Sequence, residues 1–233
     1  MRALVIGNSD GIGLATTRAL LARGHEVTGI SRRAAPIAAP GYDHIVQDVT
    51  EPRYRDVLND YLARHANIDL CIYCAGIGAR LDLNDLARQT QTFAVNLMAA
   101  VITTEVVLGH MIARDHGHFI GLSSIADLMV SPQAPAYTAS KAGISRYWEG
   151  LGRALAGRKP KLSNVRFGFV DTKMADAPLR PLLMTADAAA RFVLGVVDRP
   201  RLTATKPFVM TLLARLTTLI IRSPLSFLFV PRN

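Results

Sequence analysis

Short apolar runs bounded by glycine or turn residues alternate along this chain with longer stretches of helical periodicity. When a helix separates successive strands, the strands pair in parallel and helices cover both faces of the sheet. The strands expected on this pattern are 3–6, 26–30, 44–46, 70–74, 118–122 and 163–167, and the helices are 12–23, 54–65, 83–114, 136–156 and 186–197. The sequence therefore predicts a doubly wound parallel α/β sheet in a single domain.

Composition narrows the class of partner. The 233 residues suffice for one domain with a substantial core, and with half of them hydrophobic and 19% charged the chain is not disordered. The formal charge of +9 favours an anionic partner: nucleic acid, an anionic membrane surface or a phosphorylated cofactor. Because the arginines are scattered and no basic run is interleaved with aromatic residues, nucleic acid is the least favoured of the three.

The amino terminus and the two cysteines help to predict the cellular compartment in which the protein occurs. The apolar run 3–6 is too short for a signal peptide, so we expect a cytoplasmic protein. Cys71 and Cys74 lie in an expected strand, where residues three apart point to opposite faces. We therefore expect both to pack in the core, with a shared disulfide or zinc ion as the lesser alternative, and we expect no metal site.

A glycine-rich turn joins the first expected strand to the first helix. Gly7, Gly11 and Gly13 form a G-x3-G-x-G pattern that also contains Ser9 and Ile12. Glycines let the chain bend tightly and let a pyrophosphate approach the helix amino terminus, where free N–H groups and the helix dipole favour negative charge. Between a strand and a helix, this pattern predicts a dinucleotide-binding turn, and a plain structural turn is the alternative.

The end of the second strand bears on which dinucleotide binds. NAD sites usually carry an acidic residue here, but the chain has Ser31, Arg32 and Arg33, a hydroxyl followed by two guanidinium donors suited to the 2′-phosphate of NADP. NADP(H) is therefore preferred and NAD(H) remains possible. A solvated basic loop is the alternative, and Asp10 places an unfavourable negative charge near that phosphate.

Tyr137 and Lys141 lie four residues apart at the start of an expected helix and so share one helical face. A phenol with a pKa near ~10 exchanges protons poorly at neutral pH. A neighbouring ammonium stabilises the phenolate, so we expect Lys141 to lower the pKa of Tyr137. The pair is a candidate general acid and base.

Seven signatures in one order make the chain resemble the short-chain dehydrogenases/reductases over nearly its whole length. They are the glycine turn, Asp48-Val49, Ala75-Gly76, Asn96, Ser123-Ser124, Tyr137 with Lys141, and the run 168–172 after the sixth strand. Ser124 lies 13 residues before Tyr137, the family's spacing for its catalytic serine, and is preferred to Ser123. The fold expected is Rossmann-like, three-layer α/β/α, with strand order 3-2-1-4-5-6 and room for a seventh strand.

The resemblance implies a role for each catalytic residue. Tyr137 would be the general acid in carbonyl reduction and the base in alcohol oxidation, and Ser124 would hydrogen-bond the substrate oxygen. Lys141 would also bind the nicotinamide ribose, and Asn96 would hold a water that links Lys141 to solvent. The further cofactor contacts that it implies are Asp48, Val49, Ala75, Gly76, Val170 and Thr172, with Asp48 at the adenine and Thr172 at the carboxamide.

The chain departs from the family pattern at four positions. Cys74 replaces a usual asparagine, Ile6 a frequent threonine, Phe167 a common proline, and Asp127 stands where glycine is frequent. None of these positions carries a reacting group. They affect the packing that supports the central strands and the shape of the pocket floor.

The carboxyl terminus forms a separate feature, so we divide the chain into a cofactor-binding domain, 1–205, and an amphipathic tail, 206–233. Thr211, Arg215, Thr218 and Arg222 form one polar stripe on an expected helix whose other face is aliphatic. At ~22 Å the helix is shorter than a ~30 Å bilayer core. Packing on the domain or on a second subunit is the first interpretation, and peripheral membrane attachment is the other.

Two functions from different classes follow. The first is an NADP(H)-dependent oxidoreductase acting on a carbonyl or secondary alcohol, lipophilic if the tail meets a membrane, in a homo-oligomer as the family commonly forms. The second is a dinucleotide-binding regulator or scaffold without turnover, which the complete set of catalytic residues disfavours. A lid over the substrate is expected at 173–181, where Met174, Ala175, Pro178 and Leu179 are apolar.

Overall fold

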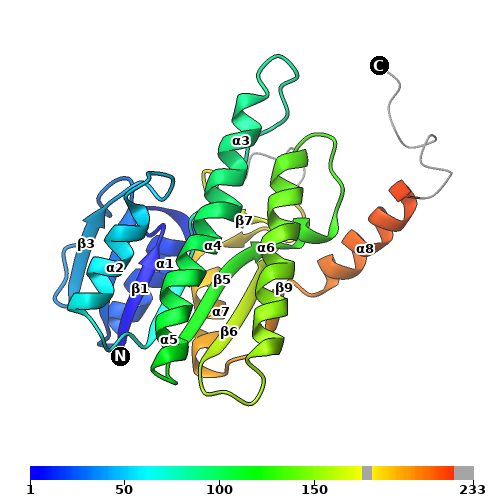
Figure 1. Cartoon of the computed structure of the whole chain (residues 1–233). Coiled ribbons are helices and arrows are strands. Elements are labelled where there is room, and N and C mark those ends of the chain that lie inside the picture. Colours follow the sequence, from blue (N-terminus) through cyan, green and yellow to red (C-terminus); the bar gives the residue numbers. More distant parts are fainter. Residues whose placement is uncertain (175–179, 223–233) are drawn as a thin grey trace.

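The computed structural model describes residues 1–174 and 180–222 and is built on a seven-stranded parallel sheet (Figure 1). Its strands are β1 (Arg2–Ile6), β2 (Glu26–Ser31), β3 (Tyr42–Val46), β4 (Leu70–Tyr73), β5 (His118–Ser124), β6 (Lys161–Phe167) and β9 (Thr203–Lys206). Their order is β3-β2-β1-β4-β5-β6-β9, which confirms the predicted order and adds β9 as the seventh strand. A separate two-stranded sheet pairs β7 (Val170–Asp171) with β8 (Met184–Thr185).

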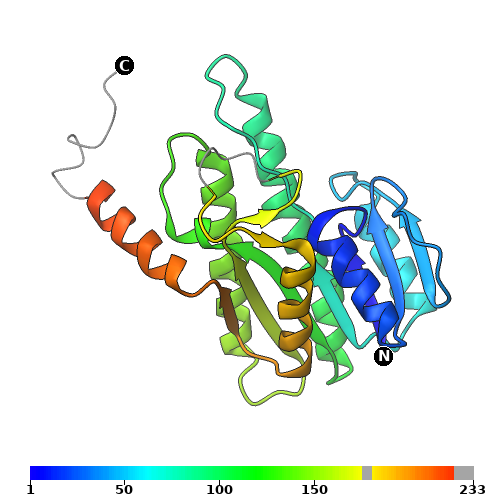
Figure 2. The same ribbon diagram turned by 180° about the vertical axis from the view of Figure 1, so that it is seen from behind.

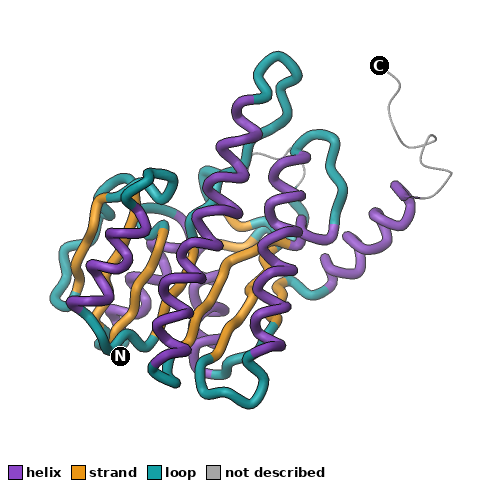
Figure 3. Tube along the Cα trace, in the orientation of Figure 1, coloured by secondary structure: helices purple, strands orange, loops and turns teal. Residues whose placement is uncertain are grey.

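Helices form a layer on each side of the sheet (Figures 1, 2 and 3). One face carries α2 (Tyr54–Arg64), a long helical run from 87 to 113 and α6 (Pro135–Ala154). The other face carries α1 (Gly11–Ala22) and α7 (Ala186–Asp198), which pack on each other and on the central strands. The central strands β1 and β4 are buried along nearly their whole length, as expected for a parallel sheet covered on both faces.

The two cysteines lie on opposite faces of the sheet, as their spacing predicts. Cys71 packs in the core beneath α2 and α6, whereas Cys74 packs against the core beneath α1 and α7. Both are free thiols. Within the described parts of the chain, no group of three or more histidine, cysteine or acidic side chains is placed to hold a metal ion.

The long helical run differs from the single regular helix predicted at 83–114. It consists of α3 (Ala87–Phe93), a π-helical turn η1 (Ala94–Met98), α4 (Ala99–Thr103), a second π-helical turn η2 (Thr104–Leu108) and α5 (Gly109–Ala113). Its 27 residues include an 18-residue window with a mean hydropathy of 1.6, long and apolar enough to cross a membrane, but half of that window is buried inside the structure. π-Helical turns in longer helices often mark functional sites, and η1 contains Asn96.

The last described helix, α8 (Val209–Arg222), exposes part of its aliphatic surface to solvent. Thr211 and Ala214 are buried against the domain, and the Thr218 hydroxyl donates a 2.6 Å hydrogen bond to the Leu128 carbonyl. An apolar stripe on the opposite side is exposed: Phe208 (77%), Leu212 (68%), Leu216 (54%) and Leu219 (69%). Of the expected alternatives, packing on its own domain holds for Thr211, Ala214 and Thr218, whereas this stripe is left for a second subunit or a membrane surface. The apolar run 225–230 lies outside the described residues.

The helix projects from the body of the molecule along the β9 edge of the sheet (Figures 1 and 2). It is anchored on η3 (Ile125–Leu128), the single 3₁₀ turn that follows β5. An unpartnered aliphatic stripe on such a helix is a surface suited to a further partner.

Candidate active site

The glycine turn between β1 and α1 requires its glycines for two separate reasons. Gly7 has a φ of +83° and Gly11 a φ of +52°, a region that other residues rarely adopt. At Gly13 the limit is space, because a Cβ there would lie 2.1 Å from the carbonyl oxygen of Gly7. The backbone can therefore turn tightly into α1, and the N–H groups of its first turn are left without intrahelical partners.

Asp10, in this turn, is paired rather than left as a bare negative charge. It caps α1 by accepting a 2.8 Å hydrogen bond from the Gly11 N–H, and its other oxygen lies 2.8 Å from the Lys173 ammonium. The Lys173 hydrogen bond, with the one from Gly11, lowers the pKa of Asp10. Lys173 thus offsets the charge that the sequence analysis took as unfavourable to a nearby phosphate.

Thr172 lies over the same turn, since a Cβ on Gly11 would be 3.0 Å from its γ-methyl group. Gly7 approaches the end of β4 in the same way, because its Cβ would lie 2.5 Å from the backbone nitrogen of Ala75. The carboxyl ends of β1 and β4 and the segment after β7 therefore meet at one point. Ligands of doubly wound sheets bind at this edge.

The basic group after β2 lies at that edge too. The Ser31 hydroxyl donates to the Arg33 carbonyl at 2.7 Å, and the guanidinium of Arg32 lies 3.8 Å from the Asp48 carboxylate. Both arginines are exposed. Asp48 also accepts from the N–H and the hydroxyl of Thr50, at 2.9 and 2.8 Å. The remaining backbone candidates near the edge differ in burial: Ser9 and Ile12 are half-buried, and Val49 and Val170 are buried.

Asn8 is a residue of the turn that the sequence analysis did not single out. Its buried amide donates to the Tyr42 hydroxyl at 2.8 Å and accepts from Ser31 at 3.3 Å. A Cβ on Gly29 would fall 1.9 Å from the Asn8 amide nitrogen, so the glycine in β2 makes room for this side chain. The polar residue inside the glycine pattern was the available signal, but its partners are distant in sequence.

The four candidate catalytic residues gather on β5, η1 and α6. Ser124 ends β5 and caps η3 by accepting from the Ala126 N–H at 3.1 Å, and its hydroxyl donates to the Phe167 carbonyl at 3.4 Å. The Lys141 ammonium is buried and donates to the Leu122 carbonyl at 3.0 Å. Pro135 at the first turn of α6 fits the fixed φ of a helix start and aims this part of the helix at the site.

Asn96 holds the loop after β4. Its Oδ1 accepts from the Ile77 N–H at 2.8 Å, and its Nδ2 donates to the Ile77 carbonyl at 2.8 Å and to the Ser140 hydroxyl at 3.2 Å. Both amide protons are thereby used, while one acceptor position of Oδ1 remains. The point where a Cβ on Gly76 would lie is 3.5 Å from that oxygen and 3.7 Å from the Lys141 Nζ.

The protonation behaviour of this group differs from the expectation that Lys141 lowers the pKa of Tyr137. Burial raises the pKa of Tyr137, the hydrogen bond from Ser124 lowers it, and the charge of Asp127 raises it again. Burial lowers the pKa of Lys141 to about 8. The predicted lowering is wrong for the chain's own residues, because the ammonium is directed to the Leu122 carbonyl on β5.

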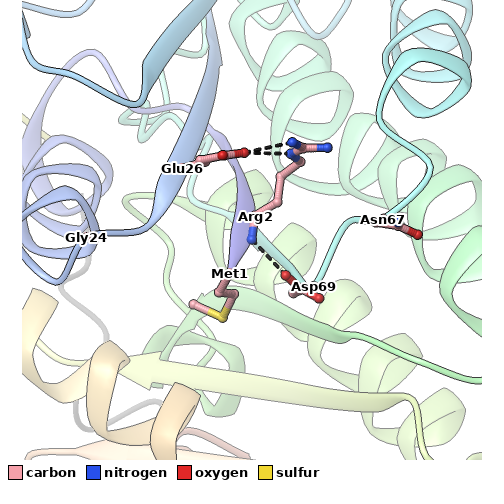
Figure 4. Close-up of a pocket in the computed structure, with 6 residues that line it drawn as sticks. All are labelled: Met1, Arg2, Gly24, Glu26, Asn67 and Asp69. Carbon is pink, nitrogen blue, oxygen red and sulfur yellow. Dashed lines mark hydrogen bonds and ion pairs between the residues drawn. The ribbon is translucent and has the colours of Figure 1, made fainter.

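A hollow lies at the opposite, amino-terminal edge of the sheet (Figure 4). It measures about 310 Å³ and is lined by residues at the starts of β1, β2 and β4. Its polar groups are already paired: Arg2 contacts Glu26 at 2.8 Å, and the Arg2 N–H donates to Asp69 at 2.7 Å. The predicted residues all lie away from it, so we assign no function to this hollow.

Comparison with known proteins agrees with the fold and the candidate site described above. The family model for short chain dehydrogenases matches residues 1–180. The chain is 31% identical over 177 residues to a probable NADP-dependent dehydrogenase of Haemophilus influenzae, covering 72% of this chain and 70% of the relative. It is 26% identical over 182 residues to a bovine (Bos taurus) 3-oxoacyl-[acyl-carrier-protein] reductase, covering 73% and 76%. The crystal structure of a short-chain dehydrogenase from Streptomyces avermitilis superposes with a TM-score of 0.80 at 23% identity, covering 94% of this chain and 91% of that one.

Proposed function

The chain belongs to the short-chain dehydrogenase/reductase family and is an oxidoreductase of CH–OH or carbonyl groups; we propose that it interconverts a carbonyl compound and a secondary alcohol with NADP(H), with Tyr137 as general acid and base. The observation that carries the proposal is the placement of Ser124 at the end of β5 and of Tyr137 and Lys141 in the first two turns of α6, where the buried Lys141 ammonium donates to the Leu122 carbonyl of β5. An acidic hydroxyl, an adjacent hydroxyl donor and a cation are the groups that protonation of a carbonyl oxygen requires.

We propose NADP(H) as the cofactor because of the shape and chemistry of the edge of the sheet at the carboxyl ends of β1 and β4. The close approach of Gly13 to Gly7 leaves no side chain where a pyrophosphate would meet the start of α1, and the exposed guanidinium groups of Arg32 and Arg33, which follow Ser31, supply donors for a 2′-phosphate. The name of the Haemophilus influenzae relative agrees with NADP. When bound, the nicotinamide would supply or accept the hydride.

Each catalytic side chain then has a defined task. Tyr137 donates its phenolic proton to the carbonyl oxygen, and Ser124 donates a hydrogen bond to the same oxygen as charge develops there. Lys141, held against the Leu122 carbonyl, would bind the ribose of the nicotinamide half of the cofactor. A water at the Gly76 face would lie within reach of Lys141 and Asn96, which supports the proposed proton relay between them.

The test is a panel of aldehydes and ketones of graded lipophilicity, assayed for oxidation of NADPH and of NADH. We expect turnover with NADPH on at least one class of lipophilic carbonyl, because Met174 in the expected lid, and Leu182 and Leu183 directly after it, are exposed and apolar. Tight NADPH binding with no turnover of any carbonyl or alcohol would instead favour a regulator or scaffold.

The choice of NADP over NAD is tested at Arg32. Because hydrogen bonds to a charged group contribute about 1.5–3 kcal/mol, Arg32→Ala should raise the KM for NADPH by roughly 10- to 100-fold and leave that for NADH nearly unchanged. Arg55→Ala, which removes an arginine that pairs with Glu105 away from the edge, is the matched control. Equal losses with both cofactors would show that Arg32 does not read the 2′-phosphate.

We further propose that α8 makes a peripheral contact with an anionic membrane surface, which would give access to a lipophilic substrate. The exposed apolar stripe supplies the inserting surface, and a cationic hollow of about 280 Å³ lies between α7 and β9, beside the start of α8. Arg191, Arg201 and Lys206 line it, and none of the three has an ion pair within the described ranges. Leucines with nearby cations suit an anionic lipid surface.

The membrane proposal predicts that the protein sediments with phosphatidylglycerol vesicles, less so at high salt, and not with phosphatidylcholine vesicles. The double change Leu212→Glu and Leu216→Glu should lower vesicle binding at least about tenfold, because each leucine contributes about 1.5–3 kcal/mol when buried. Leu83→Glu, an equally exposed leucine elsewhere, should have no effect.

We also propose a homo-oligomer, whose size light scattering would give. If the wild type ignores vesicles and the same double change dissociates that oligomer, then a second copy and not a membrane covers the stripe.

A further inference from the structure

An ion pair joins the glycine turn to the segment that follows β7. The Lys173 ammonium lies 2.8 Å from one oxygen of the Asp10 carboxylate, and the other oxygen caps α1 at the Gly11 N–H. Asp10 thus places a negative charge at the amino terminus of α1, and Lys173 places a positive charge beside it. The pair is neutral as a whole, at the helix end where the pyrophosphate of a dinucleotide would bind.

A carboxylate at this helix end opposes the cofactor in two ways. It occupies the Gly11 N–H, which leaves the N–H groups of Ile12 and Gly13 as first-turn donors for a phosphate. Its charge also repels each phosphate group of the cofactor. The repulsion is stronger for NADPH than for NADH, because the 2′-phosphate adds nearly two further negative charges. An unpaired Asp10 would therefore select against NADP(H).

The carboxylate belongs to the same edge as the group proposed to bind the 2′-phosphate. Asn8, two residues before Asp10 in the glycine turn, accepts a hydrogen bond from the Ser31 hydroxyl at 3.3 Å. The hydrogen bond from Lys173 lowers the pKa of Asp10 most, and the charge of Arg33 lowers it further. Asp10 is therefore ionised at neutral pH, so its charge acts on any anion that binds here.

The residues on either side of Lys173 fix its place over the turn. Before it, the Thr172 γ-methyl lies 3.0 Å from the Cβ position of Gly11. After it, the Met174 Cγ lies 3.3 Å from the Cβ position of Gly78, in the loop that follows β4. The Lys173 side chain itself is 83% exposed. Because an exposed ion pair contributes little to stability, we expect the pair to matter chiefly through the charge at this edge.

We propose that Lys173 is a specificity-determining residue that acts through Asp10: its ammonium cancels the charge of the carboxylate, so that the edge accepts the additional phosphate of NADP(H). The inference rests on the proposed function, because it concerns the cofactor of that reaction. It makes cofactor affinity depend on the net charge of the two side chains and not on the contact between them.

The test is a double-mutant cycle in which fluorescence titration gives the Kd of NADPH and of NADH. Lys173→Met leaves an uncancelled negative charge, and should raise the Kd of NADPH by roughly 3- to 10-fold and that of NADH by a smaller factor. Asp10→Asn leaves a positive charge and keeps a side chain that can cap the helix, so it should lower the Kd of NADPH by about two- to fivefold. The double variant is neutral like the wild type, and its Kd should lie within about twofold of the wild-type value.

Rescue by the second substitution separates an effect of charge from a structural one. If the ion pair only holds the segment after β7 in place, both single variants and the double variant should weaken NADPH binding alike, and that result would overturn the inference. Lys159→Met is the matched control, because it breaks an equally exposed pair with Asp115, 3.2 Å apart, at the amino-terminal edge of the sheet. It should leave both Kd values unchanged. The effect of Lys173→Met should shrink at high salt, which screens exposed charges.

The two proposals fail separately. If the wild-type protein shows no saturable binding of NADPH, the proposed cofactor is wrong, and the inference with it. If NADPH binds and Lys173→Met leaves its Kd unchanged, or raises it without rescue by Asp10→Asn, only the role of Lys173 is wrong.

Discussion

Replacing Tyr137 with phenylalanine is expected to lower kcat/KM for carbonyl reduction by about 10²- to 10⁴-fold, the usual contribution of a general acid. The change removes one hydroxyl and keeps the aromatic ring in the first turn of α6. Affinity for NADPH should therefore stay nearly the same. Steady-state kinetics gives the first quantity, and fluorescence titration of bound NADPH gives the second.

Tyr147→Phe is the matched control for this change. Tyr147 lies on the same helix, is partly buried and packs against the core, but takes no part in the site. It should keep full activity. If Tyr137→Phe retains activity within a few-fold of wild type, another group supplies the proton and the proposed mechanism is wrong.

The second large effect is expected at Gly13. A methyl group there would lie 2.1 Å from the Gly7 carbonyl oxygen, and because that atom belongs to the backbone the turn itself must shift. Gly13→Ala should weaken NADPH binding by roughly 10- to 100-fold, equivalent to ~1.4–2.8 kcal/mol, with a lower melting temperature as well. Titration with NADPH and thermal unfolding measure the two effects.

Gly195→Ala separates this crowding from the general effect of a methyl group on a helix. Gly195 lies in α7 with no atom within 4 Å of its Cβ position, so its replacement should leave NADPH affinity unchanged and stabilise the helix by up to ~1 kcal/mol. Wild-type NADPH affinity in Gly13→Ala would mean that the cofactor does not approach this turn.

The sequence predicted the sheet well because strand patterning is local. All six expected strands are present with ends shifted by at most two residues, and β9 fills the place left for a seventh. The long helix was less predictable: each π-helical turn accommodates an extra residue, which a search for one helical period cannot detect. The orientation of α8 was missed because Thr218, polar in sequence, contacts η3 and Thr211 is buried.

The candidate site shows the same difference between local features, which could be predicted, and long-range features, which could not. Its members could be named from local motifs, but the contacts that set their chemistry are long-range. Lys173 pairs with Asp10 across more than half the chain, and Arg166 on β6 pairs with Asp127 on η3. The pKa of Tyr137 is the clearest case: the spacing to Lys141 suggested a lowered value, whereas burial, which no motif encodes, raises it.

The hydrogen bond from Thr218 to the Leu128 carbonyl joins the tail to the turn that carries Ser124. Whatever occupies the outer side of α8 is thus one helix and one short turn away from the reacting hydroxyls. Coupling between two sites is reciprocal. A partner that stabilises the catalytic conformation of this turn would therefore bind more tightly while substrate is present. The tail would then act as a thermodynamic link between location and turnover.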